Sequence, residues 1–200
     1  MPLNTSLAEL PSLDDIRKEK ARRHLDDFGR HMLQLEAARH HSFVNAKLEA
    51  VAHGETKRLM LFEPPGHAKS TWTSWLFAAW YLGQHPEHQV MALSHTADFA
   101  TSWGRKVRNL FSLPEWPFPE ARLAKDSQAA DEWSTTAGGG YYAAGLGGTI
   151  TGKRANLIII DDPVKGREEA NSQPIRQKRW DSYIADVRNR RLPGCAIVLI

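Results

Sequence analysis

A lysine followed by two hydroxyl residues stands where a predicted strand gives way to a predicted helix. The stretch 63–71 reads Glu-Pro-Pro-Gly-His-Ala-Lys-Ser-Thr and follows the apolar run 58–62. At such a junction, backbone N–H groups and the positive end of the helix can hold phosphate oxygens. Lys69 would reach the β- and γ-phosphates of a nucleotide, and Ser70 would offer its hydroxyl to Mg²⁺, which prefers oxygen ligands. The segment is a candidate phosphate-binding loop.

This loop departs from the usual Gly-x-x-x-x-Gly-Lys-Ser/Thr pattern, because Glu63 and Ala68 stand at its two glycine positions. Gly66 keeps one flexible point, so a phosphate cradle is still geometrically possible. The alternative is an ordinary strand-to-helix turn in which Lys69 is solvated. The candidate nucleotide-binding residues are Pro65, Gly66, His67, Ala68, Lys69, Ser70 and Thr71.

Two adjacent carboxylates, Asp161 and Asp162, follow the run Leu-Ile-Ile-Ile, which is typical of a parallel strand buried on both faces. Ligands of open α/β sheets collect at the carboxyl ends of such strands. In a phosphate-loop enzyme the first carboxylate holds Mg²⁺, and the second can take a proton from the attacking water. The alternative is a solvated acidic turn before Pro163. The two motifs in this order, ~90 residues apart, favour one magnesium-nucleotide site.

From residue 58 onward, strand-like and helical patterns alternate, as in βαβ units that form a parallel sheet. Strands are predicted at 58–62, 89–94, 156–160 and 195–200, and helices at 70–81, 97–111 and 171–190. The first of these helices has one apolar stripe, which must pack on the sheet. Half of the fourteen glycines fall in 138–152, where turns or a hairpin are predicted.

The first 57 residues are mostly helical in pattern. Ser12-Leu13-Asp14-Asp15 is a capping box ahead of Ile16, and a second helix is predicted over 30–53, ending at Gly54. We therefore divide the chain into a helical extension at 1–57 and a phosphate-loop core at 58–200.

The composition is that of a globular protein, with 42% hydrophobic and 24% charged residues in a chain of 200, and it excludes disorder, collagen and coiled-coil classes. No stretch approaches the ~20 apolar residues of a membrane span. The N-terminus shows neither a secretory signal nor a transit peptide, so we expect a cytoplasmic protein. Cys195 lies in an apolar run and predicts a buried hydrophobe rather than redox chemistry. The region 151–191 holds ten Lys/Arg against six Asp/Glu, which hints at a polyanionic partner.

These motifs resemble a known family, the large terminase subunit that packages DNA in tailed bacteriophages and prophages. Terminases of one broad group carry a Pro-Pro-x-His-x-Lys-Ser loop, which 64–70 resembles. The run 145–152 and the segment 157–165 resemble the family's approach to its Walker B strand, and the likeness extends from about residue 31 to residue 200.

The resemblance implies an α/β fold, a RecA-like P-loop NTPase of the additional-strand type. It gives Lys69 and Ser70 the Walker A roles, Asp161 the role of Mg²⁺ ligand, and Asp162 that of the acid that activates water. Many terminases have Glu at that last position, and the Asp side chain is shorter. The adenine side is implied to lie near His40, His41, Ser42 and Phe43.

Members often carry an arginine inside the phosphate loop, and this loop has none. A charge-stabilising arginine must then come from elsewhere. Arg105 and Arg108 stand three apart on the polar face of the 97–111 helix, whose apolar side carries Trp103 and Val107. They could act across a subunit boundary, or they could simply form a solvated helix face.

The implied activity is Mg²⁺-dependent ATP hydrolysis that drives double-stranded DNA into a procapsid in the host cytoplasm. The implied partners are DNA, the portal protein, the small terminase subunit and further copies of the chain in a ring on the portal, with no membrane. The chain ends at Ile200, before the coupling motif, lid and nuclease of the family. We therefore expect no nuclease activity, and weak or no hydrolysis by the chain alone.

Four other interpretations are weighed against this one. A non-catalytic or decayed DNA-binding or portal-interacting fragment would use the basic helix 171–190, and another P-loop NTPase, such as a helicase-like protein, is a further alternative. Gly138-x-Gly140-x-x-Ala143 matches a dinucleotide fingerprint, but it lacks the preceding apolar strand and the following helix. His24, His31, His40 and His41 have no spacing or acidic partner that predicts a metal site.

Overall fold

Seven strands form one mixed sheet in the part of the chain that the computed structural model describes, residues 11–148, 150 and 152–200. The first ten residues, with Thr149 and Thr151 of the glycine-rich run, lie outside the described residues. The sheet order is β1-β7-β6-β2-β5-β4-β3. The strands are β1 (Arg58–Met60), β2 (Gln89–Ser94), β3 (Leu123–Gln128), β4 (Glu132–Thr135), β5 (Gly140–Gly145), β6 (Ala155–Asp161) and β7 (Arg191–Leu199).

Strands β1, β7, β6, β2 and β5 are parallel to one another. Strand β4 pairs antiparallel with β5, and β3 pairs antiparallel with β4. Strand β7 lies between β1 and β6, so the strand before the loop and the strand that ends in Asp161 are not neighbours. The mainly parallel α/β sheet of the additional-strand type, with flanking helices, is therefore confirmed.

Alternate residues of the central strands bury the two faces of the sheet, as the pleat requires. Val90, Ala92 and Ile159 pack with the helices η1 (Thr71–Phe77, a π-helix), α4 (Ala78–Gln84) and α5 (Ala97–Leu110). Met91 and Ile158 face the other way and pack with Val187 and Cys195. Cys195 is buried and free, and burial raises the pKa of its thiol to about 11.

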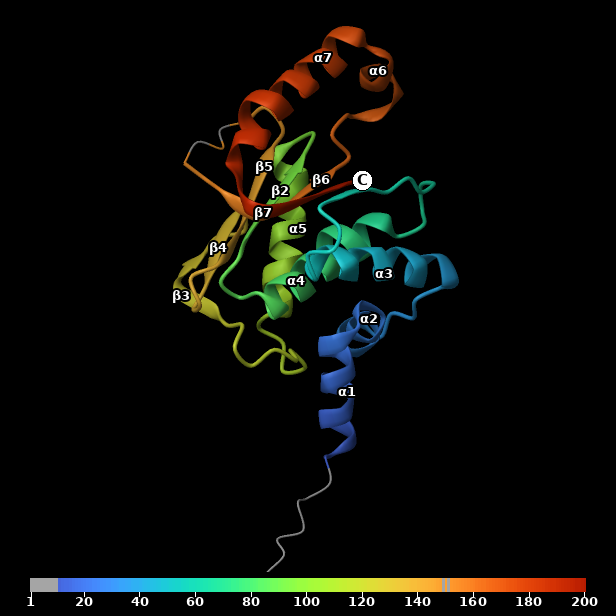
Figure 1. Ribbon diagram of the computed structural model, residues 1–200, viewed down its shortest axis with the longest axis vertical. Helices are drawn as coiled ribbons and strands as arrows, with labels where there is room; N and C mark the ends of the chain where they lie inside the picture. The colour runs from blue at the N-terminus through green and yellow to red at the C-terminus, as the bar shows by residue number, and fades with distance from the viewer. Residues whose placement is uncertain (1–10, 149, 151) are drawn as a thin grey trace, which may run out of the picture.

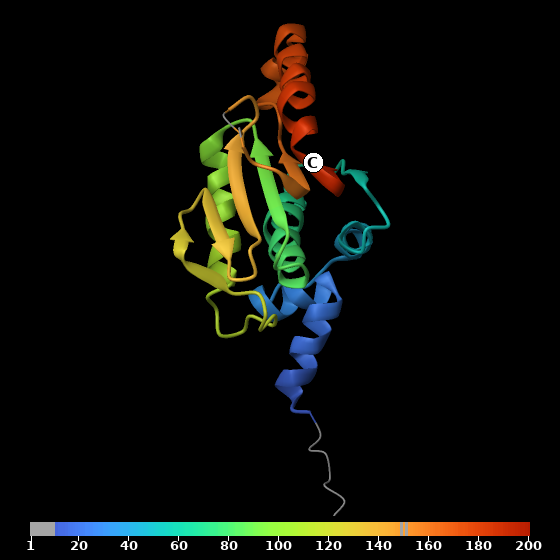
Figure 2. The same ribbon diagram turned by 60° about the vertical axis from the view of Figure 1, so that its left-hand side comes forward.

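Three helices precede the sheet: α1 (Leu13–Arg23), α2 (Leu25–Leu33) and α3 (Arg39–Ala52). Ser12 and Asp15 form the predicted capping box of α1. The single helix predicted over 30–53 is wrong, because Gln34 adopts a left-handed conformation (φ +54°) and ends α2. In both ribbon views, α1 projects at the end of the molecule opposite to α7 (Gln173–Ser182) (Figures 1 and 2).

The predicted turns or hairpin of the glycine-rich region are confirmed as a hairpin, because β5 in this region pairs antiparallel with β4. A Cβ built on Gly139 would lie 2.3 Å from the carbonyl oxygen of Pro86, and one on Gly140 would lie 2.6 Å from that of Trp133. These glycines permit close approach of neighbouring backbones, which the sequence pattern does not separate from turn formation.

Two predicted helices are irregular in the structure. The helix predicted at 70–81 runs on to Gln84, and its first seven residues after Ser70 are π-helical. The helix predicted at 171–190 is interrupted at Ser172. Residue 171 ends the preceding helix α6 (Gly166–Asn171), and α7 is followed by a π turn (Tyr183–Val187) and a 3₁₀ turn (Arg188–Arg190). None of the helices in the described part of the chain has the length and apolar character that a bilayer crossing demands.

Candidate functional site

The loop between β1 and η1 uses two left-handed residues to turn from strand to helix. Gly66 has φ +82° and Ala68 has φ +56°. Ala68 occupies the position where the usual loop has glycine, so the backbone adopts the turn that glycine favours although a methyl group is present. The N–H of Trp72 donates to the carbonyl of Ala68 at 3.0 Å, which starts the helix. Lys69 and Ser70 therefore lie at its beginning.

The N-terminal turn of α3 lies against this loop. His41 Nδ1 accepts from the N–H of Ala38 at 3.1 Å, so Nε2 carries the ring proton and donates to the carbonyl oxygen of His67 at 3.0 Å. The rings of His40 and His67 are 5.5 Å apart. Phe43 is 67% exposed on the same helix. The histidines that the sequence assigned to the adenine side thus lie beside the loop.

Asp161 ends β6 beneath the start of the helix and is only 3% exposed. Its Oδ1 accepts a hydrogen bond from Ser70 Oγ at 3.1 Å, and its Oδ2 accepts one from Ser74 Oγ at 2.7 Å. Burial raises the pKa of Asp161, the two serine hydrogen bonds oppose that rise, and the nearby charges of Asp162 and Lys69 act in opposite directions. The carboxylate is a buried anion that a cation would stabilise.

Asp162 follows immediately and points toward the loop. Its Oδ1 lies 3.9 Å from Lys69 Nζ, with the two side chains 46% and 23% exposed. Asp162 has φ +45°, a left-handed conformation that is uncommon for residues other than glycine. Uncommon backbone geometry of this kind clusters at functional sites. The pair joins the loop to the end of β6.

Residues that the sequence analysis missed fix the backbone of Asp162. The N–H of His95 donates to the Asp162 carbonyl at 3.2 Å, and His95 Nδ1–H donates to the same oxygen at 3.0 Å. Ser94 Oγ lies 3.4 Å from that oxygen. The available signal was the end of the predicted strand 89–94, because parallel strands bring their carboxyl ends to one edge. For Ser74, the signal was its spacing of one helical turn from Ser70.

The two candidate arginines lie elsewhere. Arg108, in the last turn of α5, donates from Nη1 to the Gln128 carbonyl at 2.6 Å and from Nη2 to Asn109 Oδ1 at 3.2 Å. Arg105 is exposed on the same helix. The first turn of α5 follows β2 at the site edge, so Arg108 lies roughly 16 Å along the helix from it. Within one chain, neither arginine is brought to the loop.

Comparisons with known proteins agree with this geometry. A family model described as "Terminase large subunit, T4likevirus-type, N-terminal" matches residues 60–188. Among solved structures, the large terminase of bacteriophage HK97 is similar, with a TM-score of 0.52 and 15% identity over 92% of this chain. At that identity the likeness shows the fold alone, and this chain spans 37% of the length of the HK97 chain. No curated protein matches the sequence significantly.

The family match covers more than half of the chain and includes the loop from Phe62 onward, Ser74, His95 and both aspartates. The chain belongs to the terminase large subunit family, of which it carries the N-terminal part.

Proposed function

We propose that this chain binds Mg-ATP between the loop 63–70 and the pair Asp161–Asp162 and hydrolyses it. The observation that carries the proposal is the meeting of Lys69 with Asp162, at 3.9 Å, and of Ser70 with Asp161, at 3.1 Å. A cation, a hydroxyl and two carboxylates thus gather at the carboxyl edge of a parallel sheet, next to a helix start. Phosphate-loop enzymes place the same groups at this edge.

The donor set fits Mg²⁺. Ser70 and Asp161 offer hydroxyl and carboxylate oxygens, the ligands this hard cation prefers. Asp161 is nearly inaccessible to solvent, and among the described residues only serine hydroxyls hydrogen-bond its oxygens. When bound with nucleotide, the ion would neutralise charge on the phosphate oxygens. We assign its ligation to Ser70 and Asp161.

Each remaining group has a part that follows from its position. The Lys69 ammonium binds the β- and γ-phosphates, and the loop N–H groups hold the phosphate oxygens. The Asp162 carboxylate orients the attacking water and accepts its proton. Aspartate reaches less far than glutamate, so its backbone position decides whether it reaches the water. We infer that His95 and Ser94 set that position through the Asp162 carbonyl.

The charge that develops on the γ-phosphoryl oxygens calls for a further fixed cation. Arg105 and Arg108 are remote from the loop of their own chain, so we propose that either acts on a neighbouring subunit. This agrees with a motor in which copies of the chain form a ring on the portal protein, with double-stranded DNA as substrate and the small subunit as partner, in the bacterial cytoplasm. The adenine side would be the start of α3, at His40 to Phe43.

The rival function, a DNA-binding fragment without catalysis, depends on the basic side chains of 171–191. Three of these guanidinium groups are engaged within the chain. Arg176 donates to the Ala170 carbonyl at 2.7 Å, Arg179 to the Leu146 carbonyl at 2.7 Å, and Arg191 to the Arg188 carbonyl at 2.8 Å. These contacts indicate that the three arginines stabilise the fold rather than bind DNA. We therefore prefer the ATPase to the DNA-binding fragment.

The test pairs Lys69→Ala with Lys20→Ala, an exposed lysine of α1 that serves as the matched control. We expect Lys69→Ala to lower phosphate release at least ~100-fold, the usual cost of removing one group that stabilises transition-state charge. Hydrogen exchange should show that Mg-ATP protects residues 63–70 in the unmodified chain and not in Lys69→Ala. Salt-dependent DNA binding should be the same in both variants.

Because hydrolysis can depend on a complete ring, protection of the loop is the decisive measurement for the isolated chain. Unchanged exchange at 63–70 with saturating Mg-ATP would contradict the proposal. Equal loss of DNA affinity and of nucleotide binding in Lys69→Ala would favour the rival function.

A further inference from the structure

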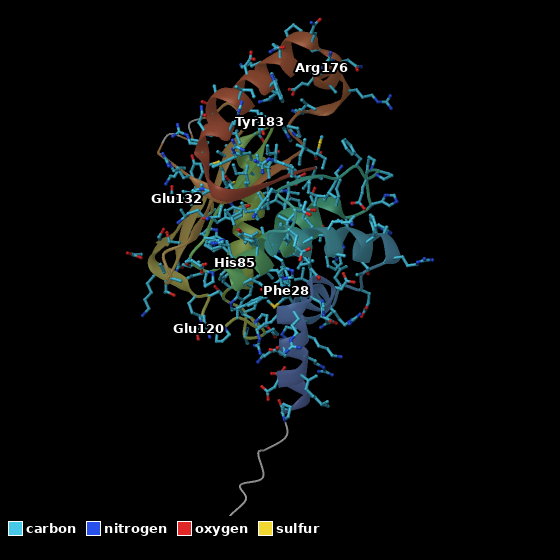
Figure 3. The ribbon with its side chains drawn as sticks, viewed as in Figure 1. Phe28, His85, Glu120, Glu132, Arg176 and Tyr183 are labelled. Atoms are coloured by element: carbon cyan, nitrogen blue, oxygen red, sulfur yellow. The ribbon has the colours of Figure 1, made fainter. Side chains whose placement is uncertain are left out.

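A second group of metal-ligating side chains lies at the end of the sheet opposite to the nucleotide site. His85, Glu87 and His88 each offer one ligand atom, and these atoms all lie within 4.8 Å of one another. They belong to the turn between α4 and β2, whereas Ser94 and His95 mark the other end of β2, about 17 Å along the strand. Figure 3 shows His85 well away from Arg176, which lies at the top of the view.

Each imidazole is anchored by one nitrogen and keeps the other for a ligand. His85 Nε2–H donates to the carbonyl oxygen of Ala52 at 3.1 Å, which leaves the Nδ1 lone pair. His88 Nδ1 lies 2.9 Å from Tyr81 Oη, and its Nε2 lies 3.4 Å from Glu87 Oε1. Hydrogen bonds to the second nitrogen orient histidines in metal sites in this way and fix the tautomer that binds.

Tyr81 serves as such an anchor rather than as a ligand. Its Oη lies 2.9 Å from His88 Nδ1. Its hydroxyl therefore holds His88 by a hydrogen bond to the nitrogen that does not face Glu87.

The backbone of the turn is fixed as well. The Pro86 carbonyl accepts hydrogen bonds from Thr135 Oγ1 and from the N–H of Gly139, the latter at 3.2 Å. The N–H of Gly140 donates to the His88 carbonyl at 2.9 Å. The three side chains therefore project from a segment that is held against β4 and β5. Because the backbone of this segment is already ordered, a bound ion would have to order little of it.

An ion can reach the group from solvent. The side chains of His88 and Glu87 are 30% and 58% exposed. A cavity of about 220 Å³ lies beside them, lined among others by Tyr81, His88, Ala52 and Asn156. The rings of His85 and His88 are stacked, with centroids 4.7 Å apart.

We propose that His85, Glu87 and His88 form a binding site for one zinc ion. Two imidazole nitrogens and a carboxylate oxygen suit Zn²⁺ and its transition-metal neighbours, whereas Mg²⁺ and Ca²⁺ prefer oxygen ligands alone. The site is separate from the nucleotide site in place and in metal chemistry, and it does not depend on the proposed ATPase. A bound ion would tie the turn before β2 to the end of α3 through His85 and to α4 through Tyr81.

The test uses the 200-residue chain without a histidine tag, stripped with a chelator and titrated with Zn²⁺ in the presence of millimolar Mg²⁺. We expect calorimetry to give one Zn²⁺ per chain. The melting temperature should rise by about 5 °C or more once free Zn²⁺ exceeds its Kd 100-fold. The absorption spectrum of Co²⁺ in place of Zn²⁺ should show bands typical of bound imidazole, and Mg²⁺ should not displace either ion.

Substitutions assign the ligands. His88→Gln and Glu87→Gln should each weaken Zn²⁺ binding at least ~10-fold. Glu87→Gln changes a mostly exposed side chain and leaves the fold intact, so it keeps the test valid if a histidine variant misfolds. The matched control is His24→Gln, which removes an exposed imidazole whose Nδ1 lies 3.6 Å from Glu49 Oε2. It should bind Zn²⁺ like the unmodified chain.

Absence of stoichiometric Zn²⁺ binding in the unmodified chain would overturn the proposal. So would binding that persists unchanged in Glu87→Gln and His88→Gln, or a loss in His24→Gln equal to theirs.

Discussion

The carboxyl group of Asp161 is buried. It is 3% exposed, and in the part of the chain that the structure describes it accepts hydrogen bonds from the neutral hydroxyls of Ser70 and Ser74. Burial raises its pKa above the ordinary value of 3.8 despite those hydrogen bonds. An ionised group in this place costs folding free energy, and a cation bound as proposed would offset that cost.

This cost predicts how stability depends on pH. Because the folded-state pKa of Asp161 is raised, its contribution to stability is fully present below pH 3.8 and is lost as the pH rises through the folded-state pKa. Asp161→Asn has no carboxylate to ionise, so in EDTA at pH 7 it should exceed the wild type in stability by about 1 kcal/mol. The difference should shrink as the pH falls toward 4. Urea denaturation across this range measures it.

The control for this prediction is Asp126→Asn, because Asp126 is exposed on β3. It should give no such pH-dependent gain. A wild type that is more stable than Asp161→Asn at pH 7 without divalent ions would contradict the prediction.

Part of the site could be predicted because its signals are local in sequence. The strand-to-helix loop and the acids after an apolar strand are contiguous patterns, and parallel topology brings both to one edge. The end of strand 89–94 places His95 at this edge, but its contact with Asp162 also depends on the register that sets Ser94 beside Asp161 in neighbouring strands. The left-handed backbones of Ala68 and Asp162 are set by tertiary structure and have no signature in the residue type.

At the level of elements, strongly periodic segments were predictable and weakly apolar ones were not. Strand β2 has the predicted bounds 89–94, and α5 ends one residue before the predicted 97–111 helix. Strands β3 and β4 were missed, since they lie at a sheet edge and carry polar residues. Strand β5 reads Gly-Tyr-Tyr-Ala-Ala-Gly, a composition that is typical of turns as much as of strands. Its place between β2 and β4 comes from packing.

Gly138 and Gly139, two neighbouring glycines before β5, are needed for different reasons. One allows another backbone segment to approach closely, and the other allows a left-handed backbone conformation. A Cβ on Gly139 would lie 2.3 Å from the Pro86 carbonyl oxygen and 2.4 Å from that of His88, whereas one on Gly138 would meet nothing within 4 Å. Gly139→Ala should therefore cost about 3 kcal/mol of unfolding free energy, because backbone must move. Gly138→Ala, at φ +90°, should cost about 1 kcal/mol from conformational strain alone. Chemical denaturation compares them, and equal costs would refute the close-approach explanation.

Across the whole molecule, one hydrophobic cluster joins the N-terminal helices to the sheet. Leu25 and Phe28 of α2 belong to the same cluster as Trp80 of α4 and Ile159 of β6. Trp80 Nε1 also donates to the carbonyl of Ala21 in α1 at 3.0 Å. The proposed division into 1–57 and 58–200 follows the sequence pattern, but a shared core predicts that both parts unfold together. The start of α3, beside the loop 63–70, would then be held in place by the whole fold.

Phe28 tests this coupling, because it is fully buried and its ring lies 5.9 Å from that of Trp116 and 6.0 Å from that of Phe118. Phe28→Ala should lower the unfolding free energy by about 3–5 kcal/mol, the usual cost of emptying an aromatic position in a core. Phe43→Ala, at a 67% exposed position of α3, should change it by less than about 0.5 kcal/mol. Native-state hydrogen exchange should show faster exchange in α1, α2, β2 and β6 alike in Phe28→Ala, because the shared core opens as one unit. If only α1 and α2 lost protection while β2 and β6 kept wild-type rates, the helices would be a separate unit, and the loop would depend on the sheet alone.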